Sequence, residues 1–314
     1  MNYTAKKNDP IVQVVMATYN GEKYIKKQIE SIFSQKGCKI QLLIRDDGST
    51  DGTIEEIRKL KSKYNINLII GSSHEGVAKG FLQALKVSDK AEYYAFSDQD
   101  DIWFDDKIQV AIEKLEKVKD SSAVYVSNLY IMNEETPTNI KMWSDKDPFI
   151  TEYKQLLVNH TSHMFGCTMV LNYQLYENVC RKLPQNPRMH DEWIGLVASL
   201  TGSIIYDSVP HMYHRIHQEN VVGGFLDKAD VWKWRIQRLL GKKRGQMAMQ
   251  AKDMLDCFPR ELMKKQGDLK YTKIVASYNN GFKERIIYLR NFDHVMMTKK
   301  QFMFHVFLGL LNLL

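Results

Sequence analysis

Short apolar runs alternate with amphipathic segments along the first part of the chain. Residues 11–17 (IVQVVMA) form a nearly continuous apolar run rich in β-branched side chains, a pattern that favours a buried parallel strand. Similar runs follow at residues 40–44, 67–70, 92–97 and 123–127. Between the runs, apolar residues recur three or four positions apart, which predicts helices over residues 24–35, 53–60, 77–85 and 108–115. This alternation predicts a doubly wound, mostly parallel α/β sheet.

The pattern changes after residue 128. Residues 133–147 are polar and predict a long excursion from the sheet. Beyond it we expect a strand at residues 166–171, a helix near residues 191–199 and a strand at residues 203–206. From residue 227 the chain is basic, with helical periodicity and no clear strand. We therefore expect one α/β domain over residues 1–225 and a helical extension over residues 226–314.

Polar side chains follow three of the predicted strands at the point where each strand ends. In open parallel sheets, ligands bind at this carboxyl edge. The candidates there are Thr18, Tyr19, Asn20, Asp46, Asp47, Asp98, Asp100 and Asp101.

The three carboxylates of residues 98–101 (DQDD) repel one another unless a cation lies among them. Hard oxygen ligands suit Mg²⁺ or Mn²⁺, ions that commonly also bind phosphate oxygens. A solvated acidic turn that caps the next helix is the alternative. Asp46 and Asp47 would either accept hydrogen bonds from a base or a ribose hydroxyl, or form an Asx-turn with Gly48.

Composition narrows the class of protein. The chain of 314 residues is 44% hydrophobic and 26% charged, as in ordinary globular proteins. A net charge of +7 favours an anionic partner, which is a nucleotide, an anionic membrane or a nucleic acid. Four scattered cysteines without a CxxC pair favour a reducing compartment. We find no secretory signal, no apolar run of the about 20 residues that span a bilayer, no GxGxxG and no P-loop, and so expect a soluble or surface-bound cytoplasmic protein.

Six ordered segments together resemble bacterial glycosyltransferases of family 2. They are VVMATYNGEKYIKKQIESIFSQ, LLIRDDGSTDGT, AFSDQDDIW, GCTMV, MHDEWIGLVAS and YHRIHQENVVGG. The resemblance covers residues 11–225 and implies the GT-A fold, that of the nucleotide-diphospho-sugar transferases. The last three segments resemble the rhamnosyltransferase-like branch, which acts in capsule, O-antigen and rhamnose-polysaccharide assembly.

The resemblance implies roles for individual residues. A nucleotide-sugar pocket would be lined by Ala17, Thr18, Tyr19, Asn20, Asp46, Asp47, Asp98, Asp101, Trp103 and Arg215. The metal ligands would be Asp98, Asp100 and His217, with Mn²⁺ or Mg²⁺ as the cofactor. Asp191 would be the catalytic base, with Glu192 as the adjacent alternative because HDEW stands where many relatives have an ED pair. His190 and His214 would either contribute to the site or have a purely structural role.

These roles imply an inverting, metal-dependent glycosyltransferase. It would move rhamnose from dTDP-rhamnose, or a hexose from a UDP-sugar, onto a growing lipid-linked glycan in bacterial cell-surface polysaccharide synthesis. One metal and one general base suffice for a single displacement. A protein-linked glycan is the alternative acceptor. A non-catalytic protein that binds a nucleotide sugar or a nucleic acid is the alternative of another class. Since a nucleic-acid binder gives no account of DDGST or SDQDD, we expect no nucleic-acid partner.

The C-terminal segment KKQFMFHVFLGLLNLL is apolar from Phe302 onward and too short to span a bilayer. With Lys299 and Lys300 at its start, a helix here is expected to lie in a membrane interface. We therefore expect peripheral contact with the inner face of the plasma membrane. Packing on the protein itself, or contacts within a homo-oligomer, are the alternatives.

Overall fold

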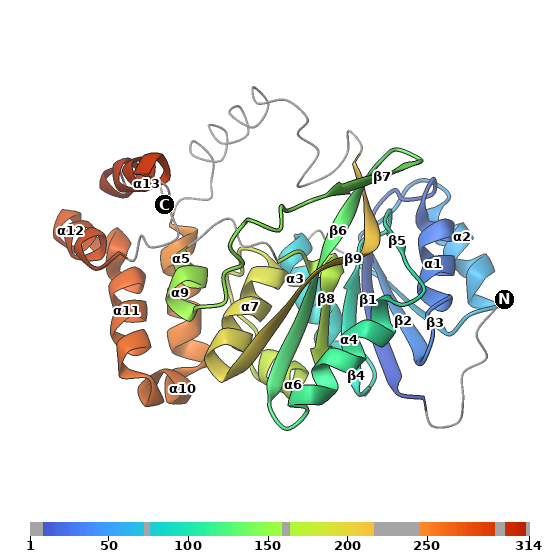
Figure 1. Ribbon diagram of the computed structural model, residues 1–314, viewed down its shortest axis with the longest axis horizontal. Coiled ribbons are helices and arrows are strands. Elements are labelled where there is room, and N and C mark those ends of the chain that lie inside the picture. Colours follow the sequence, from blue (N-terminus) through green and yellow to red (C-terminus); the bar gives the residue numbers. More distant parts are fainter. Residues whose placement is uncertain (1–8, 72–75, 159–163, 217–244, 293–298, 312–314) are drawn as a thin grey trace. The chain divides into compact units, whose positions relative to one another are not determined.

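The computed structural model describes residues 9–71, 76–158, 164–216, 245–292 and 299–311 (Figure 1). The chain forms two compact units. The first consists of Met1–Phe149, His163–Leu183 and Met189–His217, and the second of Ile150–Ser162, Pro184–Arg188 and Gln218–Leu314. The domain boundary expected at residue 225 falls outside the described residues and stays a prediction.

Four parallel strands begin the sheet of the first unit, in the order β3-β2-β1-β4. They are β1 (Ile11–Thr18), β2 (Lys39–Asp46), β3 (Ile66–Ile70) and β4 (Tyr93–Ser97). The helices that follow them in sequence are α1 (Ile25–Phe33), α2 (Thr53–Lys61), α3 (Val77–Val87) and α4 (Lys107–Leu115). The register sets Thr18 opposite Asp46, and Met16 opposite Ser97. The polar residues after β1, β2 and β4 therefore meet at one edge.

The sheet continues beyond β4 with strands of mixed direction, in the order β8-β6-β9-β5, and β7 pairs with β6. These strands are β5 (Ile102–Trp103), β6 (Ser122–Asn133), β7 (Thr136–Lys141), β8 (Met169–Asn172) and β9 (Gly202–Ile216). β8 runs antiparallel to β4 and β6, whereas β9 runs parallel to β6. Two helices, α6 (Tyr173–Arg181) and α7 (His190–Thr201), lie between β8 and β9 in the sequence.

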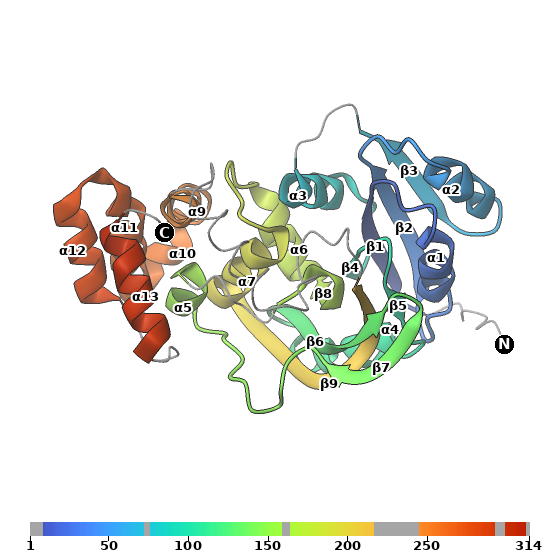
Figure 2. The same cartoon turned by 90° about the horizontal axis from the view of Figure 1, so that it is seen from above.

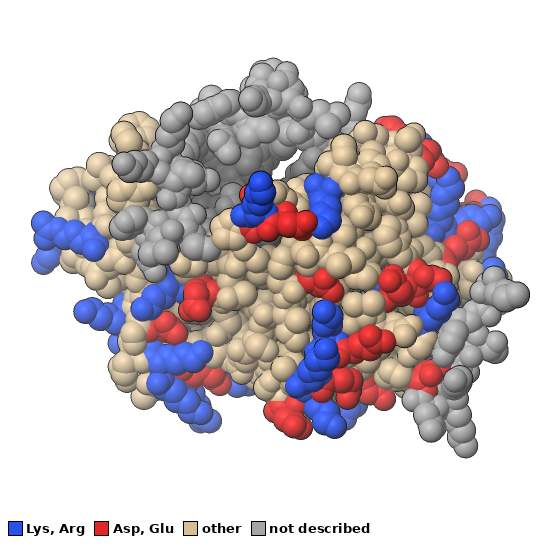
Figure 3. Space-filling model, in the orientation of Figure 1, with Lys and Arg blue, Asp and Glu red and all other residues tan. Residues whose placement is uncertain are grey.

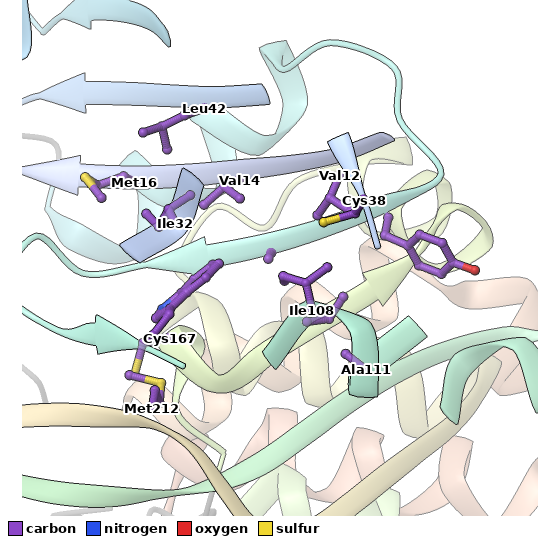
Figure 4. Close-up of a cluster of buried hydrophobic side chains, with 14 of the residues drawn as sticks. Val12, Val14, Met16, Ile32, Cys38, Leu42, Ile108, Ala111, Cys167 and Met212 are labelled. Atoms are coloured by element: carbon purple, nitrogen blue, oxygen red, sulfur yellow. The ribbon is translucent and has the colours of Figure 1, made fainter. Parts of the chain in front are cut away.

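One face of the sheet is covered by α1, α2 and α4. Side chains alternate between the two faces of a strand, so Val12, Val14 and Met16 of β1 point the same way. They belong to a buried cluster with Ile32 of α1 and Ile108 of α4 (Figure 4). Burial of these apolar surfaces stabilises the sheet that positions the polar edge.

The other face of the sheet is covered by α3 and α6. Phe96 of β4 meets Phe81 of α3 edge to face, with ring centroids 5.8 Å apart. Tyr94 of β4 stacks on Tyr176 of α6 at 3.8 Å. Figure 2 shows α3 and α4 on opposite sides of the strands. The expected α/β fold is thus confirmed, as a sheet of mixed direction between helical layers.

Two segments are more regular than the sequence predicts. The strand expected at residues 203–206 extends to Ile216. Residues 207–210 resemble a turn in sequence, but a shift in the register of β9 against β6 at Ser127 and Asn128 accommodates them within the strand. Consequently, His214 and Arg215 lie on β9 rather than after a strand. The polar excursion at residues 133–147 includes β7, which forms a hairpin with β6 through Glu134 in a left-handed conformation (φ 50°).

One predicted strand begins later than expected. Of residues 166–171, the first three form a 3-10 turn and β8 begins at Met169. In this turn the backbone N–H of Gly166 is not used by the sheet and donates to the side chain of Asp191.

The second unit is helical. It contains α5 (Tyr153–Val158), α9 (Gln246–Cys257), α10 (Pro259–Lys264), α11 (Gln266–Ser277), α12 (Phe282–Asn291) and α13 (Lys299–Leu310). α5 packs against α9 and α11, and the hydroxyls of Tyr153 and Thr272 lie 3.0 Å apart. α13 is joined to α12 by a 2.7 Å hydrogen bond between Tyr288 Oη and His305 Nε2. Within the described ranges, none of the helices has both the length and the apolar character that crossing a bilayer requires.

Candidate active site

The Asp46 carboxylate ends β2 and orders the turn that follows it. Asp46 is fully buried, and its Oδ2 accepts hydrogen bonds from Thr18 Oγ1 at 2.8 Å and Ser49 Oγ at 2.5 Å. Its Oδ1 accepts from the backbone N–H groups of Gly48 and Ser49 at 3.0 and 2.8 Å. Both oxygens therefore have partners within the protein, as in an Asx-turn. The contact of Asp46 with a nucleotide stays a prediction.

The neighbouring Asp47 carboxylate is 15% exposed and has a different setting. Its Oδ1 accepts from Arg45 Nε at 3.1 Å, and Arg45 also donates through Nη1 to Gln83 Oε1 at 2.9 Å. The backbone N–H of Asp47 donates to the Thr18 carbonyl at 2.9 Å. A carboxylate held this way and reached by solvent is suited to accept a hydrogen bond from a base or a ribose.

The turn after β1 is joined to the turns after β2 and β4. Ala17 lies partly buried on β1, and Tyr19 and Asn20 follow as exposed residues. Gln99 accepts from the Tyr19 N–H at 2.9 Å and donates to the Tyr19 carbonyl at 3.0 Å. Asn20 has a φ of 49°, and its Oδ1 accepts from the Thr50 N–H at 2.9 Å. Three of the predicted nucleotide-binding segments thus form one polar edge.

The acidic segment after β4 carries strongly perturbed charges. Burial, followed by the charges of Asp101 and Asp100, raises the pKa of Asp98 to about 8. Asp101 is fully buried, with its Oδ1 2.8 Å from His214 Nδ1. Burial alone would lower the pKa of His214, but the charge and hydrogen bond of Asp101 raise it to about 9. Asp101 and His214 therefore form a buried ion pair beside a carboxyl group that resists ionisation.

The surroundings of Asp98 fit a divalent cation. Among the described residues, ligand atoms of Asp98, Asp101, Cys167 and His214 all lie within 4.8 Å of one another. Asp101 Oδ2 is buried without a hydrogen-bond partner among the described residues. Burial and the neighbouring aspartates raise the pKa of Asp98, and a bound cation would favour its ionised form. The predicted ligand Asp100 is buried nearby in sequence but outside this group, and His217 lies outside the described residues.

Trp103 lies in the interior, on β5. It is 3% exposed, and the Nζ of Lys107 lies 4.4 Å from the centroid of its ring. Burial lowers the pKa of Lys107 to about 8. From this position, Trp103 would influence a donor site through the packing of the segment that carries Asp98 and Asp101.

Arg215 is also buried and contacts three separate segments. Its Nε donates to the backbone carbonyl of Asp100 at 2.8 Å, and its Nη1 donates to the carbonyl of Glu134 in the β6–β7 turn. The guanidinium carbon lies 4.4 Å from the ring centroid of Tyr24, just before α1. These contacts fix the backbone of the acidic segment, and direct binding of a diphosphate by Arg215 stays a prediction.

The candidate base Asp191 lies in the first turn of α7. Its Oδ2 accepts from the Gly166 N–H at 3.1 Å, and its Oδ1 accepts from the Glu192 N–H at 2.7 Å. Burial and then the charge of Glu192 raise the pKa of Asp191 to about 7, although the backbone N–H groups oppose this shift. Glu192 itself is more exposed. A carboxyl group that titrates near neutrality is suited to general-base chemistry.

Several groups that hold this site together carry no recognisable signal in the sequence. Gln99 is the unspecified residue between two aspartates, and its contacts with Tyr19, and its close approach to Gly21, appear only in the folded protein. Gly166 supplies its N–H to Asp191 across 25 positions, which no local pattern reveals. The pairing of His214 with Asp101 likewise depends on the antiparallel alignment of β5 with β9.

Comparisons with known proteins agree with this geometry. The family described as glycosyl transferase family 2 matches residues 13–179. The dTDP-rhamnosyl transferase RfbG of Shigella flexneri is 32% identical over 220 residues, which is 66% of this chain and 73% of that protein. The UDP-Glc:alpha-D-GlcNAc-diphosphoundecaprenol beta-1,3-glucosyltransferase WfaP of Escherichia coli is 36% identical over 132 residues, which is 41% of this chain and 50% of that protein.

Solved structures share the fold at low sequence identity. S. aureus TarS (residues 1–349) in complex with UDP-GlcNAc superposes with a TM-score of 0.58 at 15% identity, covering 96% of this chain and 88% of that one. The mannosyltransferase PcManGT from Pyrobaculum calidifontis, in complex with GDP-Man and Mn²⁺, gives 0.52 at 14% identity, covering 98% and 86%. The expected GT-A architecture is confirmed by these similarities. Because the family matches more than half of this chain and RfbG is similar to it, the chain belongs to glycosyl transferase family 2 and is a glycosyltransferase.

Proposed function

We propose that this glycosyltransferase moves a sugar from a nucleoside diphosphate sugar with inversion at the anomeric carbon. Asp191 is the general base, and the acidic segment after β4 holds Mn²⁺ or Mg²⁺. The observation that carries this proposal is the proximity of two unusual carboxyl groups. The N–H of Gly166 donates to Asp191, and ligand atoms of the adjacent Cys167 and of Asp98 lie within 4.8 Å of each other, so a base and a cation-binding group lie close together.

The reaction requires one proton transfer and one displacement. The acceptor hydroxyl gives its proton to the Asp191 carboxylate as its oxygen bonds to the anomeric carbon. The bond from that carbon to the diphosphate oxygen breaks, and the electron pair leaves with the diphosphate. Asp98 and Asp100, with His217 as the third predicted ligand, would hold the divalent cation, which would supply Lewis-acid stabilisation of the leaving diphosphate. Because no covalent nucleophile of the protein takes part, the configuration inverts once.

The relatives suggest the donor and the acceptor. RfbG is named as a dTDP-rhamnosyl transferase, which favours dTDP-rhamnose, and WfaP is named for UDP-Glc, which keeps UDP-hexoses as the second candidate. The acceptor named for WfaP is linked to diphosphoundecaprenol, which supports a lipid-linked glycan. The proposed setting is therefore bacterial cell-surface polysaccharide synthesis at the inner face of the plasma membrane, with a protein-linked glycan as the alternative acceptor.

The exposed side of α13 supports contact with such a membrane. One side of the helix packs within the second unit through His305 and through Gly309, whose carbonyl accepts from Tyr278 Oη at 3.1 Å. Met303 and Phe307, four positions apart, are 70% and 55% exposed. A short apolar helix that leaves large apolar side chains in water is suited to contact with the interface of a bilayer.

The distribution of charge gives little support to a nucleic-acid partner. Among the described residues on the face seen in Figure 3, Lys and Arg side chains are interspersed with Asp and Glu rather than gathered in one basic patch. Nucleic-acid binding normally requires a continuous basic surface, since phosphate contacts supply most of the affinity. The net charge of +7 is more simply matched to nucleotide and anionic lipid headgroups.

Release of nucleoside diphosphate tests the proposed reaction. UDP-, dTDP- and GDP-sugars are supplied with Mn²⁺, Mg²⁺ or EDTA to the wild type, Asp100→Ala and Asp191→Asn, with the exposed Lys59→Ala as the control. We expect turnover of one donor that requires metal and both carboxylates. Because hydrolysis without acceptor is slow in many transferases, donor binding is measured in parallel by calorimetry. Failure of every nucleotide sugar to bind with metal dependence would refute the proposal.

Vesicle flotation tests the membrane contact separately. Vesicles of phosphatidylethanolamine and phosphatidylglycerol are mixed with the wild type, with Phe307→Asp and with the control Ile140→Asp, since Ile140 is a 60% exposed apolar residue on β7. We expect the wild type and the control to float and Phe307→Asp to remain behind. Equal flotation of all three would exclude α13 as the membrane contact, and a change in molar mass with Phe307→Asp would assign the helix to an oligomer interface instead.

A further inference from the structure

His190 has an unusual environment for a polar residue. It is 4% exposed, and neither ring nitrogen has a hydrogen-bond partner among the described residues. The ring stacks on Phe81 of α3 at 4.2 Å and lies 5.2 Å from the ring of Phe96 on β4. Burial lowers the pKa of His190 to about 3, so the imidazole is neutral. His190 therefore acts through the packing of its ring rather than through a charge.

The ring of His190 lies against Gly166. A Cβ atom at position 166 would come within 2.1 Å of His190 Nε2 and 2.8 Å of its Cε1, which no real contact permits. The backbone of Gly166 does not have a positive φ, so its conformation alone does not require glycine. Glycine is needed at this position because the imidazole fills the space that a side chain would occupy.

Gly166 also holds the proposed base. Its N–H donates to Asp191 Oδ2 at 3.1 Å, and Asp191 directly follows His190 in α7. A shift of the 166–168 turn away from the imidazole would lengthen this bond. Loss of the bond would remove one of the N–H groups that stabilise the ionised carboxylate.

We propose that His190 is a positioning residue: its ring, braced by Phe81, packs against the bare Cα of Gly166 and thereby sets the distance between the Gly166 N–H and the Asp191 carboxylate. The catalytic meaning of this arrangement rests on the proposed function, in which Asp191 is the base. The contact itself does not depend on that role, so the two ideas are tested apart.

A double-mutant cycle tests the proposal with Gly166→Ala, His190→Ala and the double variant. The pKa of Asp191 is followed by ¹³C NMR of labelled aspartate in EDTA, with Asp191→Asn to assign the signal. Among the described residues, Glu192 raises the pKa of Asp191 through its charge and Asp98 interacts with Asp191, and both are kept in every variant. We expect Gly166→Ala to raise the pKa of Asp191 by about one unit, because the added methyl displaces the N–H donor. In the double variant the methyl enters the space left by the imidazole, and the pKa returns toward its wild-type value.

Stability provides the second readout of the cycle. Gly166→Ala is expected to destabilise the wild-type background strongly and the His190→Ala background weakly, so that the two changes are not additive in urea unfolding. If Gly166→Ala fails to fold and the double variant folds, the contact is supported directly. Additive effects on stability, or a pKa of Asp191 that Gly166→Ala leaves unchanged, would overturn the proposal. Loss of turnover in Asp191→Asn is scored separately and reports only on the proposed function.

Discussion

The raised pKa of Asp191 predicts a steep dependence of turnover on pH. A pKa of about 7 means that about 9% of the carboxyl is ionised at pH 6 and about 91% at pH 8. Only the ionised form accepts the proton of the acceptor, so kcat is expected to rise about tenfold across this interval. At the ordinary pKa of 3.8, the group would be ionised throughout, and the same interval would be nearly flat.

Stability supplies an independent measure of the same group. The folded pKa of Asp191 lies above the unfolded one, so the folded state binds more protons between about pH 4 and pH 7 and loses stability as the pH rises through this window. A shift of about three units corresponds to roughly 4 kcal/mol for this buried group. Between pH 5 and pH 7.5, urea unfolding of the wild type is expected to lose about 2.5 kcal/mol more than that of Asp191→Asn. The comparison with the variant is needed because the raised pKa of Asp98 destabilises both proteins as the pH rises.

Two controls separate Asp191 from its neighbours. Glu192→Gln should keep the rise in kcat but move it to lower pH, because the variant removes the charge that raises the pKa of Asp191 and keeps the backbone N–H that donates to it. Asp98 also titrates near neutrality, but its pKa is expected to fall when a cation binds, so any part of the rise that moves with Mn²⁺ concentration belongs to Asp98. A kcat that is flat from pH 5.5 to pH 8 at saturating metal would refute the assignment of Asp191 as a base with a perturbed pKa.

Three further predictions concern groups around the site. Asp46→Ala should lower the free energy of unfolding in urea by about 2–4 kcal/mol, because four donors lose their buried acceptor. Asp47→Ala should instead weaken nucleotide binding in calorimetry, with a smaller loss of stability. Equal losses of stability in the two variants would contradict this prediction. Arg215→Met should cost about 2–4 kcal/mol and weaken metal binding, since the Asp100 carbonyl loses its donor, and normal metal affinity would count against this. The folded pKa of Lys107 is about 8, below its ordinary 10.5, so the free energy of unfolding of the wild type should increase by about 3 kcal/mol as the pH rises between these values. Lys107→Met should lack this increase in urea unfolding. Parallel curves of stability against pH for the two proteins would disprove the assignment.

The regular part of the fold can be predicted from the sequence because its signals are local. Apolar runs such as residues 11–17 are long enough to specify a buried strand, and the helices between them have clear periodicity. β9 is harder to predict, because Pro210 interrupts the pattern and only pairing with β6 shows that the strand continues. The second half of the sheet therefore depends on contacts that no local window contains.

The candidate site shows the same division. Asp46, Asp98 and Asp191 can be identified because each lies in a recognisable motif at a strand end or helix start. Their chemical states cannot be predicted, since the pKa of Asp98 depends on Asp101 and on burial in the folded protein. Likewise, the stacking of His190 on Phe81 joins residues more than a hundred positions apart.

The second unit is assembled from segments that are widely separated in the chain, and this affects its synthesis. The hydroxyl of Tyr153 in α5 is hydrogen-bonded to that of Thr272 in α11, which follows 119 residues later in the chain. At about 5–20 residues per second, the ribosome needs roughly 6–24 seconds to supply that partner. Until α9 and α11 have been made, the apolar side chains of α5, among them Leu156 and Leu157, lack the two helices against which α5 packs. Slow translation or a shortage of chaperones should therefore reduce the yield of this protein, and a chain cut at residue 225 would lack both helices that pack on α5.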